Sequence, residues 1–274
     1  MILALVAAAA GVAVVGPALN RAILRWIGQQ VVVAALLGRS PGRDEVTEAP
    51  ALCRRCGAPI EVRIGGRAVL LPWLLAGGRC RACGQRRPGW LGVVELATGL
   101  LYGLAAARIG WSRELPVVLV LLAGLVAVSA VDLVYLRIPT RFVRATGAAV
   151  AACIAGAAVT VGPVGALVGA LVGGALYGGF LGVFYLISPA MLGFGDVRLG
   201  TLIGAVVGWL AWMPDRPVEA PVTGVLGAAL LGSLAGTVAG LVLLAARRQN
   251  RPFPFGPAMA LGAVVAALGP QASA

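Results

Sequence analysis

Long apolar stretches, separated by short segments that carry arginine and other polar residues, divide this chain. A helix needs about 20 mostly apolar residues to cross the hydrocarbon core of a membrane. The pattern therefore predicts an all-α polytopic membrane protein. We expect eight transmembrane helices, at residues 1–20, 90–108, 115–136, 143–161, 164–187, 197–213, 221–245 and 256–271. The first stretch has no basic segment ahead of it, so we expect an uncleaved span and not a signal peptide.

Composition and charge support this fold class and indicate an orientation. Of the residues, 60% are hydrophobic and 12% are charged, and arginine supplies every basic side chain. The segment from Arg21 to Arg87 holds 12 of these 22 arginines. Because basic loops stay in the cytoplasm, we expect residues 21–89 to form a cytoplasmic loop and both termini to lie outside. This topology and contact with anionic lipid explain the net charge of +12, so we predict a bilayer and no nucleic acid as partner.

Two aspartates, Asp132 and Asp196, lie in otherwise apolar segments. A carboxylate within a membrane segment usually faces the protein interior and marks a functional site. The chain contains no histidine and no lysine, which excludes Ser–His, Cys–His and Ser–Lys pairs. Both aspartates fall near the cytoplasmic boundary at similar depth, and two such carboxylates share a proton as in aspartic proteases. We therefore predict an acid–base pair.

The helical phase of Asp196 supports an inward orientation. Gly200, Gly204 and Gly208 follow it at intervals of four residues, so the aspartate should lie on a glycine stripe that faces another helix. Structural roles remain as alternatives. Asp196 is also well placed to cap its helix, and Asp132 could form an ion pair with Arg137 or Arg198.

Two cysteine pairs lie in the predicted cytoplasmic loop, Cys53-x-x-Cys56 and Cys80-x-x-Cys83. Such spacing is typical of a zinc site with four thiolate ligands. Four protein ligands leave no open coordination position, so we expect a structural Zn²⁺ in a small subdomain with its core at 53–83. Redox sensing or an iron–sulfur centre is the alternative. The reducing cytoplasm disfavours disulfides.

Several further motifs lie along the chain. Besides the cysteine pairs, the chain has Asp132 followed by Ile138-Pro139. The other segments are Gly16-Pro-Ala-Leu-Asn20, Glu95-Leu-Ala-Thr-Gly99, Gly193-Phe-Gly-Asp-Val-Arg-Leu199 and Pro254-Phe-Gly-Pro257. Taken in this order, the motifs resemble those of the type IV prepilin leader peptidases, a family of aspartic proteases of the bacterial inner membrane with a Gly-x-Gly-Asp motif. Thr140 stands where the family often has an acidic or amide residue, and Arg198 stands where lysine is common.

The resemblance implies an endopeptidase that removes the leader peptide of prepilin-like proteins at the cytoplasmic membrane face, with Asp132 and Asp196 as the catalytic pair. Many family members also methylate the new amino terminus with S-adenosylmethionine, and Glu95 is our candidate residue for binding this cofactor. The implied organisation is a first transmembrane helix at 1–20, the zinc-bearing loop at 21–89 and a seven-helix peptidase domain at 90–274.

Two other classes of protein remain open at this stage. A transporter or channel would use the carboxylates for protons or cations, and would place them nearer the middle of the bilayer within broken helices. A non-catalytic assembly factor of a secretion system would need the zinc loop and neither aspartate.

Overall fold

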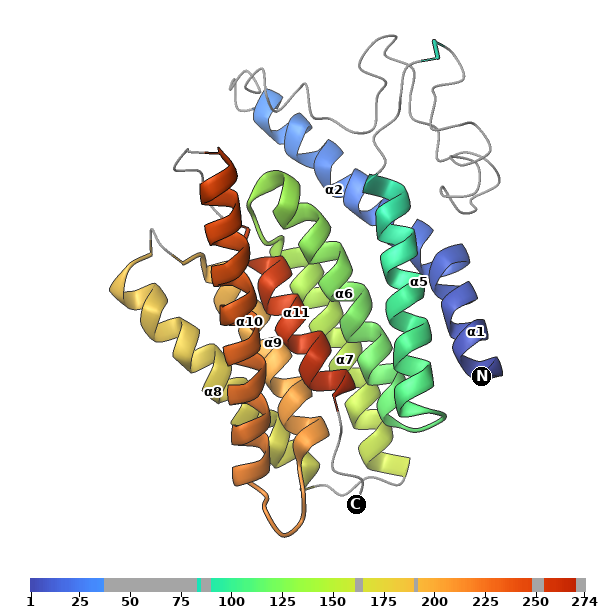
Figure 1. Ribbon diagram of the computed structural model, residues 1–274, viewed down its shortest axis with the longest axis vertical. Coiled ribbons are helices and arrows are strands. Elements are labelled where there is room, and N and C mark those ends of the chain that lie inside the picture. The colour runs from blue at the N-terminus through green and yellow to red at the C-terminus, as the bar shows by residue number, and fades with distance from the viewer. Residues whose placement is uncertain (37–82, 85–89, 161–164, 190–191, 248–253, 270–274) are drawn as a thin grey trace. The chain divides into compact units, whose positions relative to one another are not determined.

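The computed structural model describes residues 1–36, 83–84, 90–160, 165–189, 192–247 and 254–269. Within these residues the secondary structure is helical and contains no strand, which confirms the all-α part of the predicted fold class. Figure 1 shows the elements, with labels that keep their gaps in numbering. They are α1 (Ile2–Ala10), the π-helical turn η1 (Gly11–Val15), α2 (Gly16–Leu36), α5 (Trp90–Ile109), α6 (Glu114–Tyr135), α7 (Thr140–Thr160), α8 (Ala166–Ile187), α9 (Phe194–Ala211), α10 (Glu219–Arg247) and α11 (Gly256–Leu268).

Among the described residues, seven helical spans are long and apolar enough to cross a membrane. They are Ile2–Ile27, Gly92–Ile109, Glu114–Tyr135, Thr140–Ala158, Ala166–Ile187, Phe194–Ala211 and Glu219–Gly236. The eighth predicted span is a helix, α11, but it has only 13 residues. At 1.5 Å per residue it extends about 20 Å, less than the roughly 30 Å of a hydrocarbon core. Its length is limited because Pro257 can occupy only a first turn, while Pro270 favours extended backbone at Gly269.

The chain divides into two compact units, Met1–Gly103 and Leu104–Ala274. In the first unit, the helical run from α1 through α2 packs against the first part of α5 at glycines. A Cβ on Gly16 would lie 2.8 Å from the Cα of Glu95, and one on Gly11 would lie 2.8 Å from the Cα of Gly99. These glycines let two backbones approach closely, as small residues do in membrane helix pairs.

The second unit is a bundle of α6 to α11 in which α8 and α9 run side by side (Figure 1). Gly169 and Gly173 of α8 meet Gly208 and Gly204 of α9, backbone against backbone. The predicted glycine stripe on α9 therefore faces another helix, as expected. α11 packs against α6, α9 and α10, and this packing brings its first turn to the residues described next.

Candidate active site

Asp132 lies in the last turn of α6 and is 5% exposed. The helix ends four residues later at Leu136, whose backbone is left-handed with φ 53°. The Leu136 N–H donates to the Asp132 carbonyl at 2.9 Å, which closes the helix. Ile138-Pro139 then leads directly into α7. This turn places a buried carboxylate at the end of the bundle where the α6–α7 connection lies.

The side chain of Asp132 binds backbone and not a counter-ion. Its Oδ2 accepts a hydrogen bond from the N–H of Gly256, the first residue of α11, at 2.7 Å. Among the residues that the structure describes, no ion pair joins Asp132 to Arg137 or Arg198, so the predicted structural alternative for Asp132 is not seen. The motif Pro254-Phe-Gly-Pro257 therefore supplies a hydrogen-bond donor to Asp132. This contact could not be predicted from the sequence alone.

Asp196 is the third residue of α9, within the first turn of the helix. Its Oδ2 accepts a hydrogen bond from the Gly193 N–H at 3.0 Å, and its own N–H donates to the Gly193 carbonyl at 3.0 Å. The capping alternative is therefore realised, although from the third helical position and not from the N-cap. The aspartate remains partly exposed, so the cap does not withdraw its carboxylate from solvent.

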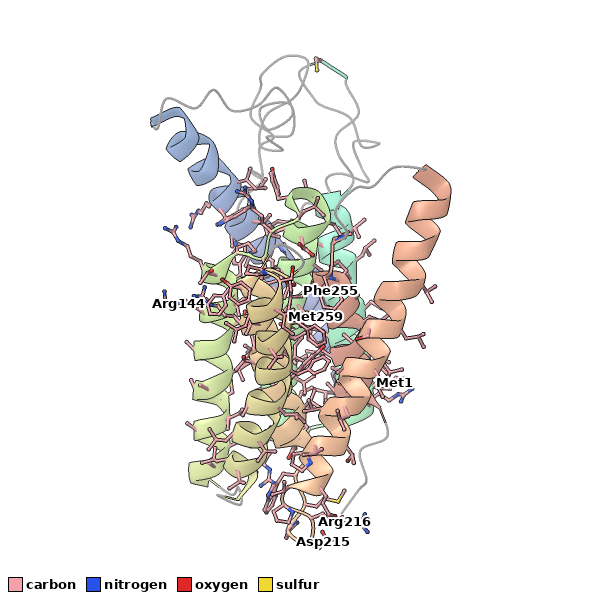
Figure 2. All side chains as sticks on the ribbon, turned by 90° about the vertical axis from the view of Figure 1, so that its left-hand side faces the viewer. Met1, Arg144, Asp215, Arg216, Phe255 and Met259 are labelled. Atoms are coloured by element: carbon pink, nitrogen blue, oxygen red, sulfur yellow. The ribbon has the colours of Figure 1, made fainter. Side chains whose placement is uncertain are left out.

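The two carboxylates lie at the same end of the second unit, where the start of α9 meets the segment that follows α6. Two contacts within the second unit hold their helices together. A Cβ on Gly195 would lie 2.8 Å from the Cβ of Ile138, so the start of α9 touches the segment that follows α6. From α11, the Met259 methyl lies 3.5 Å from the Cβ position of Gly200. Figure 2 shows the labelled Met259 inside the bundle, near the labelled Phe255.

Arg198, two residues beyond Asp196, links α9 to the start of α7. Its Nη1 donates to the hydroxyl of Thr140 at 2.8 Å, and its guanidinium lies 4.5 Å from the centre of the Phe194 ring. Thr140 and Arg198 are two of the positions at which the sequence differs from the residues common in the resembling family. The hydrogen bond between them shows that the two residues interact. The sequence alone gave no sign of this interaction.

Glu95 lies in the first unit and has no exposed surface. Its Oε1 accepts a hydrogen bond from Asn20 Nδ2 at 3.1 Å, so a carboxylate of α5 and an amide of α2 pair within the tight helix contact. Thr98, one turn along α5, is also fully buried and donates to the Val94 carbonyl at 2.7 Å. The structure thus brings together the polar residues of two sequence motifs, Gly16 to Asn20 and Glu95 to Gly99.

The predicted metal ligands fall almost entirely outside the described residues. Cys53, Cys56 and Cys80 lie there, whereas Cys83 is described and forms a turn with Gly84. Gly84 has φ 71°, a left-handed conformation that glycine adopts at no steric cost. Within the described part of the chain, no three histidine, cysteine, aspartate or glutamate side chains gather as a metal site.

Two carboxylates at helix ends do not fit the transporter alternative well. That class predicts charged residues near mid-membrane in interrupted helices. Here Asp132 is in a last turn and Asp196 is in a first turn. A bundle of membrane-length helices with neighbouring acids at one end is instead the arrangement of a membrane-embedded hydrolytic enzyme.

Comparison with known proteins supports this class. Residues 12–109 match the model of the Bacterial Peptidase A24 N-terminal domain family. The chain is 31% identical to a prepilin leader peptidase/N-methyltransferase of Bacillus subtilis, over 79% of each chain. It is also 31% identical to the enzyme of the same name from Pseudomonas aeruginosa, over 79% of this chain and 70% of that one. A type 4 prepilin-like proteins leader peptide-processing enzyme of Escherichia coli is 28% identical over 77% of this chain and 72% of its own.

The chain therefore belongs to the family of prepilin leader peptidases/N-methyltransferases, and it is a peptidase enzyme. No solved structure matches it significantly.

Proposed function

We propose that this protein is an aspartic endopeptidase that removes the leader peptide of type IV prepilin-like proteins at the cytoplasmic face of the membrane, with Asp132 and Asp196 as its catalytic pair. One observation carries the proposal. Two carboxylates from different helices lie at the same end of one helical bundle, each accepts a hydrogen bond from a backbone N–H, and neither forms an ion pair among the described residues. A pair of acids with no structural counter-ion is available for acid–base chemistry.

The chemistry needs no covalent nucleophile. Two carboxylates that share one site do not both ionise readily, so one of them retains a proton. The charged carboxylate takes a proton from a water molecule, whose oxygen attacks the carbonyl carbon of the scissile peptide bond. The protonated carboxyl group gives its proton to the carbonyl oxygen. When the carbon–nitrogen bond breaks, the leaving amine takes up a proton from one carboxyl group, and a hydroxyl group of the tetrahedral intermediate returns its proton to the other. The acid pair is thereby restored to its starting state with one shared proton.

The position of the acids suits a substrate that crosses the membrane boundary. Since both lie in terminal turns of their helices, they can meet the junction between a polar leader and an apolar helix. The relatives are named prepilin leader peptidases, and this name gives the leader of a prepilin as the segment that is removed. The arginine distribution supports the cytoplasmic face for this end, an outer location for the amino terminus and a cytoplasmic first loop.

The proposal includes a structural Zn²⁺ held by Cys53, Cys56, Cys80 and Cys83. The left-handed turn at Gly84, directly after Cys83, supports a cysteine-pair turn at one of the four ligands. When bound, the metal would cross-link the loop and supply no open coordination position for catalysis.

The proposal also includes methylation of the new amino terminus with S-adenosylmethionine, which supplies the methyl group. The names of the relatives support it, and Glu95 remains our candidate residue for cofactor binding. However, the Glu95 carboxylate is fully buried and accepts a hydrogen bond from the Asn20 side-chain amide. It is therefore not accessible to a cofactor in this conformation. The observed geometry supports a role in helix pairing, and no step of methyl transfer follows from it.

Cleavage of a prepilin in membranes tests the peptidase proposal. Native enzyme should cut at the junction of leader and apolar helix, whereas Asp132→Asn and Asp196→Asn should each lower the rate at least about 1,000-fold, because each removes one half of the acid–base pair. Mass spectrometry of the product locates the cut, and a gain of one methyl group at the new amino terminus would establish the second activity.

Cutting by either folded asparagine variant at the native rate would remove that aspartate from the mechanism. If both aspartates are dispensable for function while Cys80 is required, the assembly-factor reading gains support instead.

A further inference from the structure

The first turn of α11 contacts Asp132, and the peptidase proposal gives this contact no role. Gly256 is the first residue of this helix, and its N–H donates to Asp132 Oδ2 in a buried hydrogen bond of 2.7 Å. The next residue, Pro257, has no N–H, and the Met259 N–H binds the Phe255 carbonyl at 3.1 Å. The amide of Gly256 is thus oriented toward the carboxylate by the way in which the helix begins.

The absence of a side chain at Gly256 is as important as its amide. A Cβ at this position would lie 2.9 Å from Asp132 Oδ2 and 3.3 Å from both the Cβ and the Cγ of Asp132. Carbon atoms seldom approach so closely, and Asp132 is buried among its neighbours with little room to yield. Any larger residue would therefore push the carboxylate away or move the start of α11.

The remainder of α11 fixes this first turn in place. Met259 is 1% exposed and reaches Gly200, on the glycine stripe that continues from Asp196. The same helix therefore contacts Asp132 through its first residue and the helix of Asp196 through its fourth. A short helix with a proline-bounded start provides this double contact without the length of a membrane span.

We propose that Gly256 is a positioning residue for the catalytic pair: its amide and its lack of a side chain hold the Asp132 carboxylate in the orientation that peptide hydrolysis requires. This inference rests on the proposed peptidase function. A backbone N–H donor at a helix amino terminus stabilises a negative charge, so the contact affects the ionisation of the site as well as its geometry.

Kinetics of the full-length enzyme in membranes, with a synthetic prepilin peptide of leader and adjoining apolar helix, tests the inference. Gly256→Ala should lower kcat about 100-fold, the cost of a small misplacement of a reacting group, and should change KM less than about threefold. The acid limb of its pH–rate profile should move to higher pH, because the displaced carboxylate loses a donor that favours its charged form.

Gly232→Ala is the matched control. Its Cβ would press on the same helix, 3.2 Å from the Ala258 carbonyl oxygen, without touching Asp132. It should retain kcat within about threefold of native and an unchanged pH profile. Equal losses in both variants would mean that α11 is merely sensitive to packing, and native kcat in Gly256→Ala would overturn the inference.

A double-mutant cycle on thermal unfolding gives a readout that does not depend on activity. Gly256→Ala should lower the unfolding temperature in the native background and lower it much less in Asp132→Ala, where the clashing Oδ2 and Cγ are absent. Equal shifts in both backgrounds would contradict the positioning contact. If no prepilin is cut by native enzyme, the peptidase proposal fails, while the cycle still decides whether Gly256 positions Asp132.

Discussion

Arg198 and Thr140 illustrate how much of the site is determined by pairs of residues. Each differs from the residue common in the family, and neither change removes a proposed catalytic acid. In space they form one hydrogen bond of 2.8 Å that joins the start of α9, which carries Asp196, to the start of α7. The bond is exposed, so its contribution is expected to be modest, about 0.5–1 kcal/mol.

We expect Arg198→Lys to lose this bond, because a lysine ammonium lacks the reach and the forked donors of guanidinium. The loss should lower the free energy of unfolding by about 0.5–1 kcal/mol. Adding Thr140→Asp should recover most of it by providing a charged acceptor for the shorter side chain. Thermal unfolding of the two single variants and the double variant measures the coupling. Purely additive effects would show that the two positions are independent.

At the scale of single residues, the sequence was sufficient to select Asp132 and Asp196, because a carboxylate in an apolar segment is conspicuous. It could not identify Gly256, which carries no functional side chain and lies 124 positions away from Asp132. The motif Pro254-Phe-Gly-Pro257 singled out this segment. However, every residue except proline has a backbone N–H, so the sequence cannot show which one donates to Asp132. Glu95 and Asn20 were likewise found in separate motifs, and only the fold pairs them.

Among the helices, α8 and α9 show how the bundle uses glycine. Gly173 meets Gly204 backbone to backbone, so the two helices approach more closely than side chains would allow. Every fourth residue of α9 was predicted to face a neighbour, and this is confirmed. The length of α11 was overestimated: the predicted span ran to residue 271, whereas the helix ends at Leu268 because the prolines at its two ends restrict it.

Gly173→Ala should destabilise the protein by about 1–3 kcal/mol, since the added methyl group enters a contact that has no space for it. Gly179→Ala is its control on the same helix, because a Cβ there meets nothing within 4 Å. The control should be neutral or slightly stabilising, as alanine favours a helix. Thermal unfolding in detergent compares them, and equal stabilities would mean that α8 and α9 separate at low cost.

For the whole molecule, the division into two units is the feature that the sequence pattern did not reveal. Packing divides the chain after Gly103, within α5. The separation of a zinc-bearing loop from a peptidase domain at residue 90 concerns function and stays a prediction. Hydropathy reports where helices begin and not which helices they contact. The proposed catalytic pair lies wholly in the second unit, and the proposed zinc ligands and Glu95 lie in the first.

Metal analysis of the purified protein tests the zinc proposal at this scale. We expect about one Zn²⁺ per chain, which is the stoichiometry of a single four-thiolate site. Cys80→Ser should lose the metal, because a serine hydroxyl is a much weaker ligand than a thiolate. Cys153→Ser, in α7 of the second unit, should keep it. Zinc retained by Cys80→Ser, or lost equally by both variants, would contradict the assignment.

The hydrogen bond between Gly256 and Asp132 has a consequence for biosynthesis. A ribosome makes the chain from its amino terminus, so both aspartates are synthesised before Gly256. The nascent protein therefore passes through a stage in which its two acids are present and the donor to Asp132 is missing. Maturation of the site coincides with the insertion of the last helix, so incomplete chains that stop before α11 carry the acid pair without the contact that orients it.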